Sequence, residues 1–219
     1  MTKPLQIDYY SDILCVWAWI AQCRLEELKK QWGDQIRIRH FYVDVFGDVE
    51  QKIKESWAEK GGYSGFAKHV QQAVSAFDEI TVNPELWQQV RPRTSANAHL
   101  FVKAIEITHG VALAEDIDFK IRQSFFLEAG DIGSLDFLFG QFEHTNLHLE
   151  EITHQIHNGR ALTALMRDYR QAQSESIKGS PTYVLDSGRQ VLFGNVGYRV
   201  IHANIEELIR KPSGEASWC

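Results

Sequence analysis

Residues Asp12–Ala18 read DILCVWA and mark the point where the apolar pattern of the chain changes its period. Before them, Leu5–Tyr10 alternates apolar and polar side chains, which is the pattern of a half-buried strand. A turn follows at Asp12, and apolar residues then recur at helical spacing until Gly33. The segment therefore predicts a strand, a short turn and a helix that begins at Cys15.

The same reading extends to both ends of the chain. Ile36–Val43 is again strand-like, so the first part predicts a βαβ unit, in which the two strands are parallel. Near the other end, Thr182–Leu185 and Gln190–Phe193 flank the turn residues Asp186–Gly188 and predict a hairpin. An amphipathic helix with apolar positions in Ile201–Ile209 follows this hairpin.

The middle of the chain has a different pattern. Residues 49–176 show helical periods only, and their breaks predict six or seven helices. Neither end can bury a sheet alone, so we expect residues 1–48 and 177–212 to build one mixed sheet. The predicted fold is therefore α/β, of the order βαβ…ββα, with residues 49–176 as an inserted all-helical subdomain and residues 213–219 as a mobile tail.

Composition narrows the class of protein. The chain has 219 residues, 44% of them hydrophobic, and a formal net charge of -6, which argues against nucleic acid or an anionic membrane as the partner. The N-terminus lacks a basic region followed by a long apolar stretch, and the longest apolar run, Leu14–Ala21, is too short to span a bilayer. We therefore expect a cytoplasmic protein.

Cysteine usage fits a reducing compartment. The chain has three cysteines, Cys15, Cys23 and Cys219, so a disulfide framework is not indicated and reduced thiols are expected. Cys23 falls close to the apolar face of the first helix and is expected in the core, and Cys219 is expected as an exposed thiol of the tail. Histidine pairs at helical spacing lack a third ligand, so no metal site is predicted.

Four segments together resemble the DsbA-like branch of the thioredoxin superfamily. Asp12–Ala18 resembles the D-x-x-C-P-W-C segment of DsbA-like oxidoreductases, and equally the serine-containing segment of kappa-class glutathione transferases and 2-hydroxychromene-2-carboxylate isomerases. Gly179–Val184 resembles the cis-proline loop of the superfamily. Thr94–His99 and Phe125–Ile132 resemble two stretches of its helical insertions. The resemblance covers nearly the whole chain and implies a thioredoxin fold.

The resemblance also implies roles for individual residues. Cys15 stands at the position of the nucleophile, with Asp12 as a supporting residue of the same motif and Trp17 as a candidate substrate- or glutathione-binding residue. Ser180 and Pro181 would form a cis peptide bond that faces the thiol and offers backbone groups to a peptide or to glutathione. Gly194 and Asn195 match part of the segment that holds the γ-glutamyl carboxylate of glutathione at a helix N-terminus in the transferases and isomerases. Val196, however, replaces the acid of that segment.

The chain departs from the dithiol pattern at Ala18, which replaces the second cysteine of C-x-x-C, and at Val16, which replaces the usual proline. Cys23 is eight helical residues from Cys15, roughly 12 Å, whereas a disulfide tolerates at most about 7 Å between Cα atoms. Cys15 is therefore expected to react as a monothiol. The helix dipole is expected to lower its pKa from about 8.5 by roughly one unit, with an ionised Asp12 opposing that shift.

Three functions remain open at this point. The first is a DsbA-family thiol-disulfide oxidoreductase that acts through Cys15 by mixed disulfides, with glutathione or a protein thiol as the reaction partner. The second is a glutathione-dependent transferase or isomerase, in which glutathione supplies the thiolate. The third is a non-catalytic binding module that has lost its second thiol. No bound cofactor is expected; glutathione is a candidate co-substrate, and a homodimer is a candidate assembly.

Overall fold

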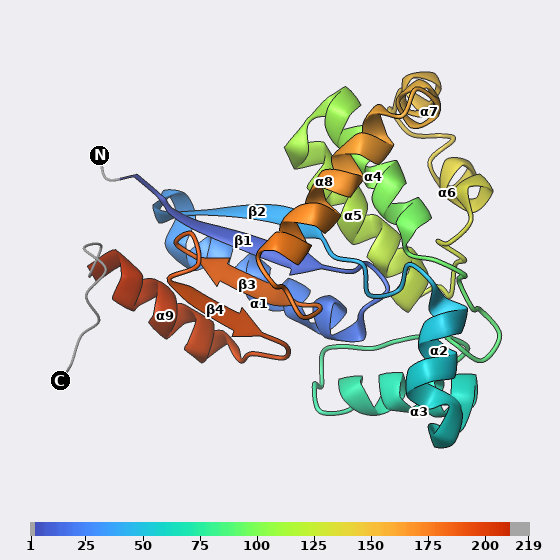
Figure 1. Cartoon of the computed structure of the whole chain (residues 1–219), viewed down its shortest axis with the longest axis horizontal. Coiled ribbons are helices and arrows are strands. Elements are labelled where there is room, and N and C mark those ends of the chain that lie inside the picture. The colour runs from blue at the N-terminus through green and yellow to red at the C-terminus, as the bar shows by residue number, and fades with distance from the viewer. Residues whose placement is uncertain (1–2, 211–219) are drawn as a thin grey trace.

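The computed structural model describes residues 3–210, and its four-stranded sheet brings the two ends of the chain together (Figure 1). The strand order is β2-β1-β3-β4. β1 is parallel to β2 and antiparallel to β3, which is in turn antiparallel to β4. The strands are β1 (Leu5–Ser11), β2 (Ile36–Tyr42), β3 (Thr182–Leu185) and β4 (Gln190–Phe193). The predicted mixed sheet, shared by both ends, is confirmed.

Helices cover both faces of this sheet. α1 (Val16–Trp32) and α9 (Tyr198–Arg210) lie on one face, where Leu25 and Ile205 share a buried cluster with Tyr9. The end of α8 (Arg160–Ser174) lies against the other face, where Ala172 packs with Tyr10, Val43 and Val184. The alternation of β1 therefore places Tyr9 and Tyr10 in two different apolar layers.

Seven α-helices lie between β2 and β3, a stretch that the structure describes in full, and its only strand-like pairing is an isolated bridge between Leu86 and Val90. They are α2 (Val49–Trp57), α3 (Gly62–Val74), α4 (Ala96–His109), α5 (Val111–Phe126), α6 (Leu135–Gln141), α7 (Leu149–His157) and α8. Short 3-10 turns occur at Gly33–Gln35 and Ala58–Lys60. The predicted all-helical stretch is confirmed, whereas the exact division of the chain at residues 48 and 177 stays a prediction.

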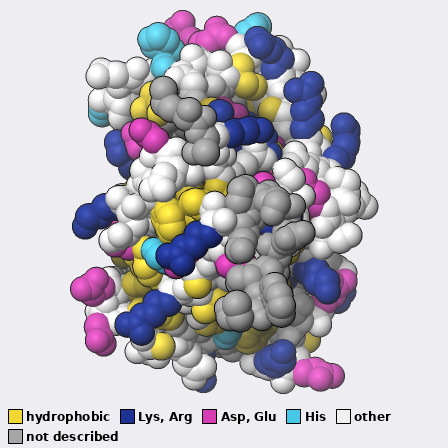
Figure 2. Space-filling view, turned by 90° about the vertical axis from the view of Figure 1, so that its left-hand side faces the viewer, with side chains coloured by type: hydrophobic (Ala, Val, Ile, Leu, Met, Phe, Trp, Pro, Cys, Tyr) yellow, Lys and Arg dark blue, Asp and Glu magenta, His cyan; other side chains and the backbone are white. Residues whose placement is uncertain are grey.

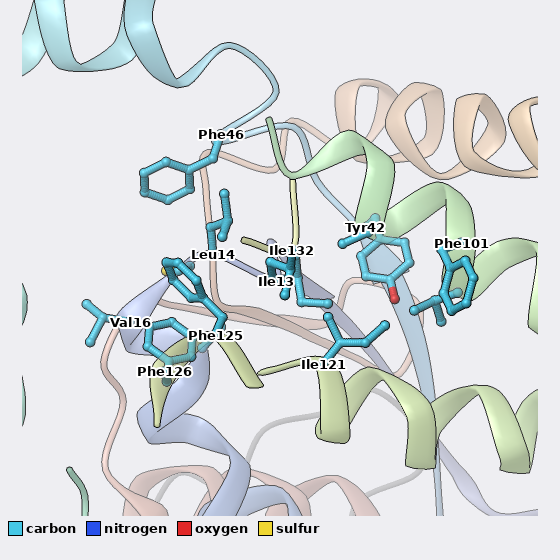
Figure 3. Packing of buried hydrophobic residues seen from close by; sticks show 14 of the residues in the cluster. Ile13, Leu14, Val16, Tyr42, Phe46, Phe101, Ile121, Phe125, Phe126 and Ile132 are labelled. Carbon is cyan, nitrogen blue, oxygen red and sulfur yellow. The ribbon is translucent and has the colours of Figure 1, made fainter. Parts of the chain in front are cut away.

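The largest apolar cluster lies where the turn after β1 meets the helical block. Ile13 and Leu14 point into the same region as Phe46, Phe125 and Phe126 (Figure 3). All five side chains are buried. The turn that carries the predicted nucleophile is thus packed against the insertion, and not against the sheet alone.

The cysteine outside the active-site motif lies elsewhere than predicted. Cys23 is exposed, not in the core, because the buried face of α1 runs through Ala21, Leu25 and Leu28 and Cys23 falls beside it. Cys219 and the tail 213–219 lie outside the described residues. No helix among residues 3–210 combines the length and the apolar character that crossing a membrane requires.

Side chains of both charges are interspersed on the face toward the N-terminus and α9, around an apolar area (Figure 2). The described part of this face therefore shows no broad basic patch of the kind that nucleic acid binding needs.

The closing helix offers a test of the fold. Ile201 of α9 is fully buried, whereas its neighbour Val200 is 51% exposed. We expect Ile201→Ala to lower the free energy of unfolding by about 2–5 kcal/mol, because it leaves a cavity under the sheet. Val200→Ala should change it by less than about 0.5 kcal/mol. Urea unfolding followed by fluorescence measures both; equal effects of the two substitutions would contradict the packing of α9.

Candidate functional site

Cys15 is the N-cap residue of α1, and its side chain meets the loop before β3. The thiol donates to the carbonyl oxygen of Ser180, with 3.2 Å between Sγ and O. The peptide bond between Ser180 and Pro181 is cis. The backbone carbonyl of Cys15 accepts from the N–H groups of Ala18 and Trp19 in the first helical turn. Residues 165 positions apart in the chain thus form one site.

The environment of the thiol differs from the expected one. Cys15 is only 6% exposed. Burial raises the pKa of its thiol above the ordinary value, hydrogen bonding from the side chain of Ser180 and from the backbone in the first turn of α1 opposes that shift, and the carboxylate of Asp12 adds to it. The expected lowering of the pKa is therefore wrong, because the cost of burying a thiolate exceeds what the helix start supplies.

The carboxylate of Asp12, fully buried, organises the turn in front of Cys15. Its Oδ1 accepts from the N–H of Leu14 at 2.9 Å. Its Oδ2 accepts from the N–H groups of Val45 and Phe46 at 3.1 and 2.9 Å and from the hydroxyl of Ser95 at 2.8 Å. One side chain therefore ties together the turn after β1, the segment after β2 and the start of α4.

His99 supports the same turn from α4. Its Nε2 accepts from the N–H of Ile13 at 3.1 Å, so Nδ1 carries the proton and donates to the hydroxyl of Tyr169 at 3.0 Å. Burial lowers the pKa of His99 to about 4, although Asp12 and its Oδ1, 3.9 Å from Nε2, favour the charged form. His99 is consequently neutral at pH 7 and acts as a hydrogen-bonding brace.

Arg122 of α5 is the third brace. Its guanidinium donates to the carbonyl of Asp12 at 3.2 Å and to the hydroxyl of Ser11 at 3.0 Å. Its Nε donates at 2.7 Å to Asp118, which also accepts from the hydroxyl of Tyr42 at 2.7 Å. Sequence reasoning missed Arg122, because an acid and a base four residues apart on a helix resemble a solvated surface pair.

Some of the other predicted site residues lie beside Cys15, and others do not contact it. Ser180 also accepts the N–H of Asp12 through its hydroxyl at 2.9 Å, and Gly194 donates its N–H to the carbonyl of Pro181 at 2.8 Å. Ala18 is buried, Trp17 is half-buried with its ring 6.1 Å from that of His69, and Asn195 is exposed. The structure thus joins Asp12, Cys15, Ser180, Pro181 and Gly194 in one place; the roles of all predicted site residues stay predictions.

Cys15 is the one thiol among the residues that the structure joins at this site. Within residues 3–210, no cluster of three or more histidine, cysteine or acidic side chains is arranged to hold a metal ion.

The role of Asp12 gives the first prediction for the site. In Asp12→Asn, the amide nitrogen that replaces one oxygen cannot accept hydrogen bonds, so buried donors lose their partner. We expect the free energy of unfolding to fall by about 3 kcal/mol. Asp44→Asn is the control, since the Asp44 carboxylate caps only the exposed N–H of Gly47. Chemical denaturation measures both, and equal stabilities of Asp12→Asn and the wild type would contradict the role given to Asp12.

The neutral state of His99 gives a pH dependence. Its pKa is about 4 in the folded protein and about 6.5 in an unfolded chain. Below pH 6.5 the unfolded state binds the extra proton first, so His99 contributes a loss of stability as the pH falls from 6.5 to 4. The loss approaches about 3 kcal/mol. The difference between wild type and His99→Gln, measured by urea unfolding at several pH values, should follow this curve; parallel curves would contradict it.

Two curated proteins are similar to this chain over most of its length. The chain is 24% identical over 188 residues to the ClpXP adapter protein SpxH of Halalkalibacterium halodurans, covering 83% of the chain. It is 25% identical over 187 residues to SpxH of Bacillus subtilis, covering 82% of the chain. The chain spans only 58% of the length of each of these relatives.

Solved structures match more completely. A candidate protein disulfide isomerase from Nitrosomonas europaea superposes with a TM-score of 0.77 at 11% identity, over 95% of this chain and 98% of that one. The cytosolic disulfide reductase DsbM from Pseudomonas aeruginosa gives 0.68 at 16% identity, over 94% and 99%. A 2-hydroxychromene-2-carboxylate isomerase gives 0.68 at 16% identity, over 97% and 100%. These likenesses show the fold, and the family follows from the sequence itself: residues 6–206 match the model of the DSBA-like thioredoxin domain, so the chain belongs to the DSBA-like thioredoxin domain family.

Proposed function

We propose that this protein is a thiol-disulfide oxidoreductase that works through the single thiol of Cys15. One observation carries the proposal: the sulfur at the start of α1 lies 3.2 Å from the carbonyl oxygen of Ser180, beside the cis peptide bond. Ala18, one helical turn away, has no sulfur with which to close an internal disulfide. An internal disulfide with residue 18 is therefore impossible, and in this proposal the partner thiol comes from another molecule.

The reaction is an exchange of sulfur bonds. Cys15 loses its proton to solvent, and the thiolate attacks one sulfur of a disulfide. A bond forms between Cys15 and that sulfur, and the other sulfur leaves as a thiolate. A second thiolate then attacks the mixed disulfide, takes the bound sulfur and releases Cys15. The protein therefore undergoes no net oxidation or reduction, and Cys15 is again a free thiol after each cycle.

The raised pKa of Cys15 sets the conditions for this reaction. Because burial raises the pKa above the ordinary value, the thiolate is a minor species at pH 7. The rate of attack should therefore increase with pH through and beyond about 8.5. A substrate that donates a hydrogen bond to the sulfur would increase the thiolate fraction on binding.

Glutathione is the proposed co-substrate. The DsbM structure from Pseudomonas aeruginosa that has been solved with GSH superposes on this chain with a TM-score of 0.66 at 17% identity. A helix start can bind a carboxylate through its free N–H groups. In this chain α9 begins just after Gly194 and Asn195, and Gly194 is bonded to the carbonyl of Pro181. We also propose that the protein acts in a reducing compartment such as the cytoplasm, where glutathione supplies the second thiolate.

A mass measurement tests the proposal. The variant Cys23→Ser/Cys219→Ser keeps Cys15 as its only thiol and is incubated with glutathione disulfide at several pH values. We expect one glutathione adduct per chain, located at Cys15 by peptide mapping, which forms faster as the pH rises through about 8.5. Intact-mass spectrometry gives the rate.

The control is the further variant Cys15→Ser in the same background, which should remain unmodified. A folded chain in which Cys15 resists glutathione disulfide even at pH 10, where free glutathione reacts, would contradict the monothiol mechanism.

A non-catalytic binding module is the second candidate, and two observations favour it. Cys15 is nearly buried, and the curated relatives are named as adapter proteins. The reaction with glutathione disulfide distinguishes the two candidates, because a binding module needs no reactive thiol and Cys15 would then remain unmodified. Turnover of a glutathione-dependent reaction that Cys15→Ser leaves unchanged would instead support the transferase or isomerase class.

A further inference from the structure

A cavity of about 470 Å³ lies away from Cys15, between α1, α4, α5 and the outer edge of β2. Neither Cys15 nor the loop of Ser180 and Pro181 lines it. Its volume falls in the range of ligand sites, roughly 300–1,000 Å³. One wall consists of six consecutive residues, Arg37–Tyr42, so the strand runs along the cavity.

The wall formed by β2 presents unpaired backbone groups. β2 is the edge strand of the sheet. Val43 donates its N–H inward to the carbonyl of Ser11, whereas Tyr42 donates its N–H outward to the carboxylate of Asp168. Because backbone groups alternate along a strand, Ile38 and His40 also point their N–H and C=O outward. Within the described part of the chain, no strand pairs with this edge.

The open edge is short and bounded. Asp168 occupies the hydrogen-bonding position at Tyr42, so the free groups are those of Ile38 and His40. A strand of about three residues, roughly 10 Å long, fits this span. Such an edge can bind an extended peptide through main-chain hydrogen bonds, which supply affinity, while neighbouring side chains supply selectivity.

The charges around the cavity favour a cation. Six acidic and four basic side chains line it. Two of the acids, Glu26 on α1 and Asp116 on α5, are exposed and bind no group that the structure describes. Of the basic residues, Lys29 is paired with Glu115, Lys103 with Asp168 and Arg39 with Asp8. The fourth, Arg37, is exposed, so two exposed acids face one exposed base. His40 adds a buried Nε2 without a hydrogen-bond partner, 3.7 Å from the carboxylate of Glu115.

We propose that this cavity docks an extended peptide segment of another protein that carries a basic side chain. The segment adds to the sheet as a strand beside β2, pairing with Ile38 and His40, and its basic side chain lies between Glu26 and Asp116. This site is independent of the thiol chemistry proposed for Cys15.

Three blocked tripeptides test the proposal on the full chain: acetyl-Val-Lys-Val amide, its counterpart with Glu in the middle, and the Lys peptide with N-methylated backbone nitrogens. We expect the Lys peptide to bind, with the largest amide shifts in NMR spectra at Ile38 and His40. The Glu peptide should bind at least about tenfold more weakly, and so should the N-methylated peptide, which lacks the donors for strand pairing. Equal binding of the Lys and N-methylated peptides, or no binding of the Lys peptide, overturns the proposal.

Matched variants locate the contact. His40→Pro and His40→Ala both remove the imidazole, but only proline removes the outward N–H, and neither removes a donor to β1. We expect His40→Pro to bind the Lys peptide at least about tenfold more weakly than His40→Ala. Asp116→Lys should also weaken binding of the Lys peptide.

Two further controls address a variant that fails to fold and a second copy of this chain as the occupant. If His40→Pro fails to fold, as its thermal melt would show, the N-methylated peptide on the wild-type chain still decides the question. Sedimentation of the wild type identifies a second copy as the occupant: a concentration-dependent dimer with shifts at the same amides would overturn the proposal in favour of pairing between two β2 edges.

Discussion

The site depends on one buried carboxylate. Asp12 accepts from the backbone of Leu14, Val45 and Phe46 and from the hydroxyl of Ser95. A buried anion is costly unless donors surround it, and the four donors here come from three segments of the chain. The shape of the turn that ends in Cys15 therefore depends on the segment after β2 and on the start of α4.

Hydrogen bonds at this turn connect the thioredoxin-like sheet to the helical block. Arg122 and His99 approach the same turn from α5 and α4, and each bonds to its backbone. Arg122 also reaches Asp118, which lines the cavity beside β2. A continuous chain of charge-assisted hydrogen bonds thus runs from the backbone in front of the thiol to the cavity at the edge of β2. The insertion is a part of the site and not an appendage.

Periodicity was sufficient to predict the sheet and the helical stretch, because strand and helix periods are local properties of the sequence. The meeting of Cys15 with Ser180 was predicted from the family resemblance of the two motifs. The thiol pKa was predicted wrongly, since it depends on how closely the helical block packs around Cys15. The exposure of Cys23 was predicted wrongly, since the buried face of α1 passes beside that residue. The supporting roles of His99 and Arg122 were missed because the backbone groups that they bind, in the turn before Cys15, lie far from them in the sequence. No local sequence pattern reveals such a contact.

The small exposure of Cys15 has a consequence for which molecules can reach it. Displacement at a disulfide needs the entering, central and leaving sulfur atoms nearly in line. A nearly buried sulfur admits only partners that can bring their disulfide bond into line with it. Slender, unfolded or terminal disulfides meet this condition, whereas a bridge inside a compact domain does not. Shape, more than acidity, would then sort the molecules that this thiol encounters.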